Sequence, residues 1–62
     1  MKALIYDEVF PDVRPVEIEN VRSVSYTQHG KTLHIYYRKE EAVCLYTVRM
    51  DDSQYKRKVV FV

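Results

Sequence analysis

The sequence has few of the residues that break a chain or cross-link it. Its 62 residues include one glycine, two prolines, one cysteine and no tryptophan. A disulfide within the chain is excluded, because Cys44 has no second cysteine to pair with. A zinc site also lacks support, since Cys44, His29 and His34 stand at no recognised ligand spacing and no Cys-x-x-Cys occurs. We therefore expect neither a structural metal nor another cofactor.

Long hydrophobic runs are missing as well. No apolar stretch approaches the roughly 20 residues of a membrane-spanning helix. Residues 1–7 carry too short an apolar run for a signal peptide. A lone cysteine is typical of proteins in reducing compartments. These features predict a cytoplasmic protein with no membrane partner.

A chain of this length has room for one domain, residues 1–62, with a thin margin of stability. Folding buries roughly 60% of the surface of an unfolded chain of this size. Apolar burial at about 25 cal/mol per Å² then nearly balances about 1.5 kcal/mol of ordering entropy per residue. Because neither a disulfide nor a metal can make up the difference, we expect association with a second copy, as a homodimer.

What the sequence does contain favours β-strands. Six tyrosines, two phenylalanines and many valines and isoleucines form a strand-rich composition with few chain breaks. The formal net charge is +1, with the acidic groups concentrated in residues 1–21 and the basic groups in residues 22–62. This separation would suit either a basic strand beside an acidic one in the same sheet, or a charged partner.

Gly30 gives the sharpest local prediction. It lies between two runs of alternating apolar and polar residues, and with His29 it predicts a two-residue type I′ hairpin turn. The predicted pairs are Gln28 with Lys31, Thr27 with Thr32, Tyr26 with Leu33, Ser25 with His34 and Val24 with Ile35. This register places on one apolar face Val24, Tyr26, Leu33, Ile35 and Tyr37. A bulge near residues 22–23 would return Val21 to the same face.

The other strands follow from the same alternation. We expect a first strand over residues 3–10, a proline-containing loop over 11–15 and a short edge strand within 16–19. After a charged loop at 38–41, a strand over 42–50 should direct Cys44, Tyr46, Val48 and Met50 to the core. A weak helical period over 37–45 leaves one helical turn as an alternative there. A turn at 51–54 and a last strand over 55–62 complete the chain.

The predicted fold is an all-β, single-domain antiparallel meander of about five strands. Five twisted strands of this length can close into a small SH3-like barrel. They can equally stay open as a sheet that a second copy completes by dimerisation.

No group of residues predicts catalysis. Ser25, His34 and Tyr36 would share a face of the hairpin, but no orienting carboxylate or concave pocket is predicted beside them. The acidic pairs at 40–41 and 51–52 fall in predicted turns, where neighbouring side chains point apart. We therefore expect a protein that is not an enzyme.

The aromatic residues are too many for one small core, and this excess is the best functional signal. Tyrosine-rich surfaces are typical of protein interfaces. The expected interface residues are Tyr6, Phe10, Tyr36, Tyr37, Tyr55 and Phe61. The sequence thus favours a non-enzymatic protein–protein interaction module. We expect a small self-associating accessory or adaptor subunit of the kind found in bacteria, phages or mobile elements.

The alternative is a small β module that binds nucleic acid. Tyr55, Lys56 and Lys58, together with Tyr36 or Tyr37, could combine basic groups with an aromatic platform for unstacked bases. Alternation would send Arg57 to the opposite face, and the net charge of +1 is small for a dedicated nucleic-acid binder. Lysines on an edge strand are also a common protection against unwanted pairing.

Overall fold

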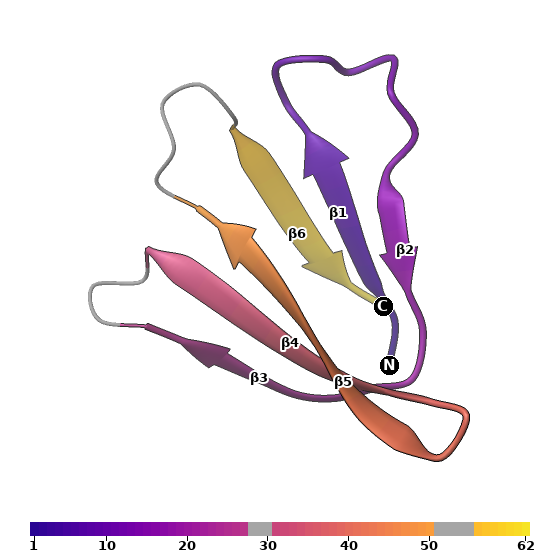
Figure 1. The fold of residues 1–62 in the computed structure, drawn as a ribbon. Helices are drawn as coiled ribbons and strands as arrows, with labels where there is room; N and C mark the ends of the chain where they lie inside the picture. Colours follow the sequence, from indigo (N-terminus) through magenta and orange to yellow (C-terminus); the bar gives the residue numbers. More distant parts are fainter. Residues whose placement is uncertain (28–30, 51–55) are drawn as a thin grey trace.

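The computed structural model describes residues 1–27, 31–50 and 56–62, and all the regular structure in these ranges is β-strand (Figure 1). The strands are β1 (Ala3–Asp7), β2 (Val16–Ile18), β3 (Val21–Tyr26), β4 (Thr32–Lys39), β5 (Ala42–Arg49) and β6 (Arg57–Phe61). They form two antiparallel three-stranded sheets, in the orders β2-β1-β6 and β3-β4-β5. The expected all-β antiparallel fold is confirmed, with six strands in the described ranges rather than about five. No helix long and apolar enough to cross a membrane occurs in the part of the chain described.

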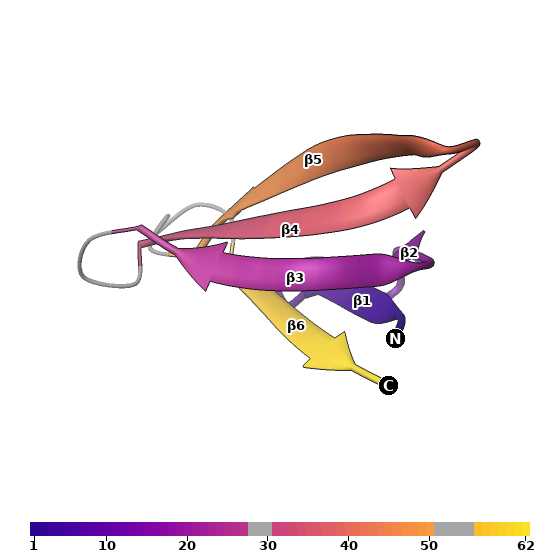
Figure 2. The same ribbon diagram turned by 90° about the horizontal axis from the view of Figure 1, so that it is seen from below.

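The two sheets lie as two layers with the core between them (Figure 2). Strands adjacent in the sequence form the β3-β4-β5 sheet, whereas the other sheet joins the two ends of the chain. Ala3 of β1 lies opposite Phe61 of β6, and Lys2 and Val62 exchange two backbone hydrogen bonds of 2.9 Å each. The hydrogen bonds between the described strands thus define two sheets and do not link them into one closed barrel.

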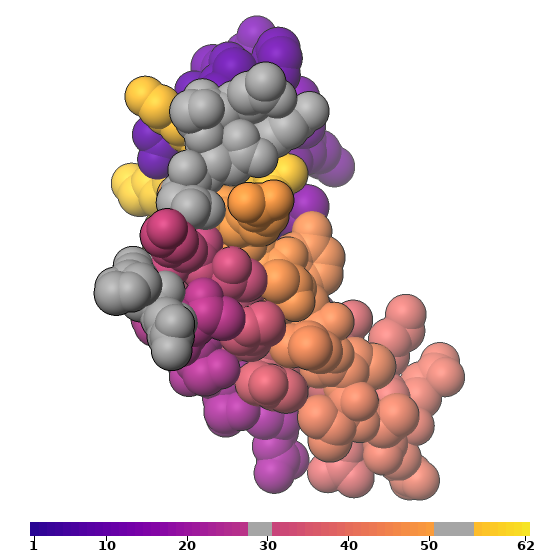
Figure 3. Space-filling model, turned by 60° about the vertical axis from the view of Figure 1, so that its left-hand side comes forward, coloured from indigo at the N-terminus to yellow at the C-terminus, as the bar shows by residue number. Residues whose placement is uncertain are grey.

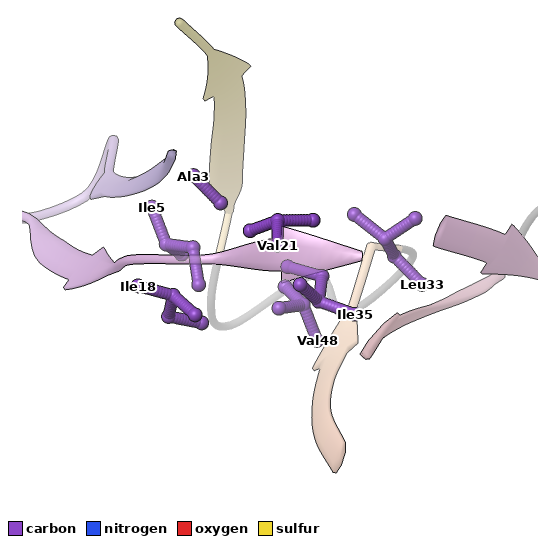
Figure 4. Packing of buried hydrophobic residues seen from close by; sticks show 7 residues of the cluster. All are labelled: Ala3, Ile5, Ile18, Val21, Leu33, Ile35 and Val48. Carbon is purple, nitrogen blue, oxygen red and sulfur yellow. The ribbon is translucent and has the colours of Figure 1, made fainter. Parts of the chain in front are cut away.

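Both layers contribute to one apolar core (Figure 4). The buried residues are Ala3, Ile5 and Ile18 from the first sheet and Val21, Leu33, Ile35 and Val48 from the second. Among the larger side chains of the described residues, only Leu33, Ile35 and Val48 are fully buried. Several partly buried residues pack around this cluster, namely Val24, Tyr37, Tyr46, Met50, Val59 and Phe61. Each sheet therefore covers the apolar face of the other within a single chain.

The β3–β4 pair has the register predicted from Gly30. Val24 lies opposite Ile35, and Ser25 lies opposite His34. The expected bulge is confirmed between Val21 and Ser23, and it leaves Val21 buried. The predicted turn residues, His29 and Gly30, and the predicted pair of Gln28 with Lys31 depend on residues 28–30, which lie outside the described residues.

One side-chain prediction for this hairpin is wrong. Tyr26 was expected in the core, but its side chain is 61% exposed. It lies opposite Leu33, as predicted, but it is the last residue of β3. Because β3 is an edge strand, the ring has a neighbouring strand on one side only. The alternation correctly predicted the pairing and could not predict how much of the ring the second layer covers.

The first strand is shorter than expected. It ends at Asp7 rather than continuing to Phe10. Oδ1 of Asp7 accepts hydrogen bonds from the backbone N–H of Val9 at 2.9 Å and of Phe10 at 3.2 Å. This side chain to backbone capping turns the chain out of the sheet, and it leaves Val9 and Phe10 exposed.

The β4–β5 hairpin is tighter than the charged loop expected over 38–41. Lys39 pairs with Ala42, and the two residues between them, Glu40 and Glu41, have φ angles of 49° and 67°. Two successive left-handed residues are the signature of a type I′ turn. The segment is extended on both sides of this turn, so the helical alternative is excluded.

The β5 strand directs the expected residues inward. Val48 is buried, and Cys44, Tyr46 and Met50 are partly buried on the same side. The final strand is shorter than expected, since β6 begins at Arg57 and not at residue 55. Tyr55 lies outside the described residues.

Candidate interaction surface

The predicted aromatic interface residues do not gather on one surface. Tyr6 lies on the outer face of β1, 37% exposed and opposite Lys58 of β6. Phe10 lies beyond the end of β1 and is 56% exposed. Phe61 is partly buried on β6 and packs against the core. Of these three side chains, Tyr6 and Phe10 are exposed to solvent, whereas Phe61 takes part in the packing of the core.

The two tyrosines of β4 point to opposite sides of the second sheet. Tyr37 packs against the core, whereas Tyr36 lies on the outer face, partly buried between Ser23 of β3 and Leu45 of β5. The outer faces of the two sheets are on opposite sides of the molecule. Tyr36 therefore belongs to a different surface from Tyr6.

The residues of the nucleic-acid alternative lie on and beside β6. Lys56 and Lys58 are both exposed, and the carbonyl oxygen of Lys56 accepts a 2.8 Å hydrogen bond from the N–H of Glu8. Since Tyr55 lies outside the described residues, the described aromatic neighbour of Lys58 is Tyr6. Neither Tyr36 nor Tyr37 shares that face.

The polar row on the outer face of the second sheet carries no catalytic arrangement. His34 lies between Ser25 and Thr47 across the three strands, and its Nδ1 is 3.4 Å from Oγ1 of Thr47. Both cross-strand neighbours of His34 are hydroxyl residues, so no carboxylate stands opposite it to orient the ring. No cluster of three potential metal ligands occurs among the residues with described positions.

An open cleft of about 490 Å³ lies between β2 and the turn end of the β4–β5 hairpin. Ile18, Tyr37 and Tyr46 contribute apolar walls, and charged residues of both signs surround them. The cleft exists because the hairpin extends past the first sheet (Figure 1). Because apolar side chains and charges of both signs line the cleft, and because it is open to solvent, it favours no particular ligand.

The most distinctive surface is the open edge of β5. This strand has eight residues and forms one side of its sheet, so one of its edges pairs with β4 and the other with no described strand. The N–H of Met50 donates to the carbonyl oxygen of Lys31 at 2.8 Å, which shows that Met50 directs its backbone toward β4. By alternation, the residues that direct their N–H and C=O groups to the open edge are Val43, Leu45, Thr47 and Arg49.

The same residues carry the outward side chains of β5. Val43 is 71% exposed and Leu45 is 52% exposed. The strand runs along the visible face of the molecule in Figure 3. Open backbone groups and exposed apolar side chains are thus combined on one strand, which is the pattern that favours pairing with another chain.

The other three edge strands are protected. β2 has three residues and contains Glu17, β3 contains Arg22, and β6 begins with Arg57 and Lys58. Short length and charged side chains both discourage pairing at an edge. In contrast, β5 has no charged residue before Arg49. The alternation that was expected to direct Cys44, Tyr46, Val48 and Met50 to the core leaves Val43 and Leu45 on the outward face, but neither was among the expected interface residues.

No similarity to a known protein indicates the function of this chain. Comparison with models of known protein families, with curated proteins and with solved structures finds no match, so its function must be argued from the residues of its own surface.

Proposed function

We propose that the protein is a non-enzymatic protein–protein interaction module that associates with itself, as a homodimeric accessory or adaptor subunit. The observation that carries this proposal is the open edge of β5, with its exposed Val43 and Leu45. Pairing along this edge would satisfy backbone groups that pair with no described strand, and it would remove apolar surface from solvent.

The small core also supports self-association. In the ranges that the structure describes, three larger side chains are fully buried, which is a small core for a domain of this size. Domains of this size commonly gain stability from a disulfide, a metal or a second subunit. A single cysteine, Cys44, provides no disulfide within the chain and suits the reducing conditions of the cytoplasm, where we place the protein.

The test is the mass of the purified protein as a function of concentration. Light scattering or sedimentation in the micromolar range should give twice the mass of the chain at the upper end and dissociation on dilution. Leu45→Lys, which places a charge on the open edge, should shift the protein to monomer. Val13→Lys adds the same charge at a residue that is 58% exposed and away from β5, and it should leave the dimer intact. A monomer at every concentration would contradict the proposal.

The pair formed by Tyr6 and Lys58 favours a second function, which is binding to single-stranded nucleic acid. An exposed ring beside a lysine on the outer face of the first sheet could stack a base and contact its phosphate. A titration with short oligonucleotides at low salt, where electrostatic binding is strongest, would detect it. No binding under these conditions excludes this second function.

A further inference from the structure

We infer that β5 pairs with β5 of a second copy in an antiparallel register centred on Leu45. The two β3-β4-β5 sheets then become one continuous six-stranded sheet across a two-fold axis. This inference rests on the proposed self-association and specifies its surface, its geometry and its partner.

The backbone restricts the possible registers. Val43, Leu45, Thr47 and Arg49 direct their N–H and C=O groups to the open edge, and the residues between them direct theirs to β4. Two copies can exchange hydrogen bonds only if the outward-directed residues face one another. The centre of a two-fold antiparallel register must therefore lie on a residue, and Cys44, Leu45 and Tyr46 are the positions near the middle of the strand.

The charges select Leu45 among these three. Glu41 and Arg49 lie at equal distances of four residues on either side of Leu45. Centring on Leu45 brings each Glu41 beside Arg49 of the partner subunit, and it does so twice because of the symmetry. Opposite charges facing each other across strands are stabilising, so both ends of the paired strands gain an attractive contact.

A two-fold centre on either neighbouring residue, Cys44 or Tyr46, does not bring Glu41 and Arg49 together. A register centred on Cys44 sets Glu41 beside Thr47 of the partner subunit and leaves Arg49 beyond the turn end of the partner's β5, which begins at Ala42. A register centred on Tyr46 sets Arg49 opposite Val43 of the partner subunit and leaves Glu41 beyond the end of the paired strands. The register centred on Leu45 alone combines the available backbone groups with two opposite-charge contacts.

The same pattern identifies a second copy as the partner. β5 has an acidic residue just before its first residue and a basic residue at its end, so it is complementary to itself when reversed. A two-fold symmetric interface requires such self-complementarity, because the same patch serves on both subunits. An unrelated extended segment would need no such relation between the two ends of the strand.

The register has a consequence for the native cysteine. Cys44 faces Tyr46 of the partner subunit, and the two Cys44 residues become diagonal neighbours. Diagonal neighbours lie about 7–8 Å apart, which exceeds the usual Cα separation in a disulfide. In contrast, two copies of residue 45 would lie about 5.5 Å apart, which a disulfide can span.

A cysteine scan along the outward side of β5 tests this geometry. Leu45→Cys, Val43→Cys and Thr47→Cys are each introduced on a Cys44→Ala background and oxidised mildly. Leu45→Cys should form a disulfide-linked dimer about tenfold or more faster than either of the others, because only residue 45 faces its own copy. Val43→Cys and Thr47→Cys should cross-link efficiently when combined in one chain, since residue 43 faces residue 47 across the axis. Val13→Cys is the control for random collision.

The outcomes separate the inference from the proposed function. Fastest cross-linking at residue 43 or residue 47 alone would show another register. A dimer in solution whose β5 variants cross-link no faster than Val13→Cys would overturn the pairing of β5 and leave self-association standing. A chain that is monomeric in light scattering would overturn both.

Discussion

Lys39 lies directly opposite Ala42 across the β4–β5 pair, so Glu40 and Glu41 alone connect these two strands. Both glutamates have a positive φ, a conformation that is unfavourable by roughly 1–2 kcal/mol for most residues other than glycine, asparagine and aspartate. Asn-Gly is the favoured pair for such a turn. The β4–β5 strands are therefore held in register by their pairing, against the preference of the turn residues.

We predict that Glu40→Asn stabilises the protein by about 0.5–1 kcal/mol, because asparagine tolerates the left-handed conformation better than glutamate does. Urea unfolding should show a higher midpoint with an unchanged slope. Glu8→Asn removes a similar charge at an exposed residue without a positive φ, and it should bring no such gain. A lower midpoint for Glu40→Asn would show that the Glu40 side chain makes a favourable contact that outweighs its backbone.

The two hairpins show what the sequence can and cannot reveal. In the sequence, Gly30 indicates a turn, and the strand pairs it predicts between described residues, such as Ser25 with His34, are correct. A turn was also predicted at Glu40 and Glu41, but its type was not, because glutamate has no preference for the left-handed conformation that a type I′ turn requires. That turn follows from eight paired positions between β4 and β5, whose combined hydrogen bonds and packing outweigh the local cost.

The division into two sheets could not be predicted for a different reason. Alternation shows which side of a strand is apolar, but it does not show which other strand covers that side. Ala3 pairs with Phe61 at the far end of the chain, and no local pattern encodes that contact. The same limit applies to the interface, because the open edge of β5 is a property of strand order and not of any single residue.

Aromatic size was therefore an incomplete guide to the interaction surface. Phe61 and Tyr37 were chosen as candidates for an interface, and both pack against the core. Val43 is smaller than either and is 71% exposed on the open edge. The exposed surface depends on which layer covers each side chain, and composition alone carries no such information.

The capping of β1 by Asp7 leads to a second prediction. Asp7→Ala should destabilise the protein by about 1 kcal/mol, because the N–H groups of Val9 and Phe10 lose their acceptor. Asp7→Asn keeps an oxygen at the same position and should retain most of the stability. The measurement is the free energy of unfolding in urea. Equal losses in the two variants would show that the charge of Asp7, and not its hydrogen bonds, stabilises this turn.

The ion pair between Lys2 and Glu17 predicts a dependence on alkaline pH. The hydrogen bond to Glu17, together with the charge of that residue, raises the pKa of Lys2 above 10.5. Because the pKa is higher in the folded state, the pair is fully stabilising below the unfolded pKa, and its contribution disappears as the pH rises through the folded pKa. At neutral pH, Glu17→Gln should lower the melting temperature slightly.

The sign of this effect can be checked by thermal unfolding at increasing pH. The difference in melting temperature between the wild type and Glu17→Gln should narrow above about pH 10.5, where the ammonium group loses its proton. Other groups that titrate in this range are common to both proteins and cancel in the difference. A difference that stays constant to the most alkaline pH would show that Glu17 does not act through the charge of Lys2.

Charge reversal on β5 gives the most specific prediction for the paired strands. Arg49→Glu places acidic groups together at both ends of the two-fold pair, and Glu41→Arg places basic groups together. Each variant alone should dimerise roughly tenfold or more weakly than the wild type, since an attractive contact becomes repulsive twice per dimer. Arg22→Glu makes the same charge change on β3 and should leave dimerisation unaffected.

A mixture of the two variants should associate again. When one chain carries Arg49→Glu and the other carries Glu41→Arg, each end of the paired strands joins one acidic and one basic group. Sedimentation of the mixture should therefore show a dimer at concentrations at which each variant alone is monomeric, and added salt should weaken this recovery because it screens exposed charges. Recovery in the mixture requires that residues 41 and 49 of different chains meet at both ends. A mixture that stays monomeric would contradict the register centred on Leu45, even if the wild type is a dimer.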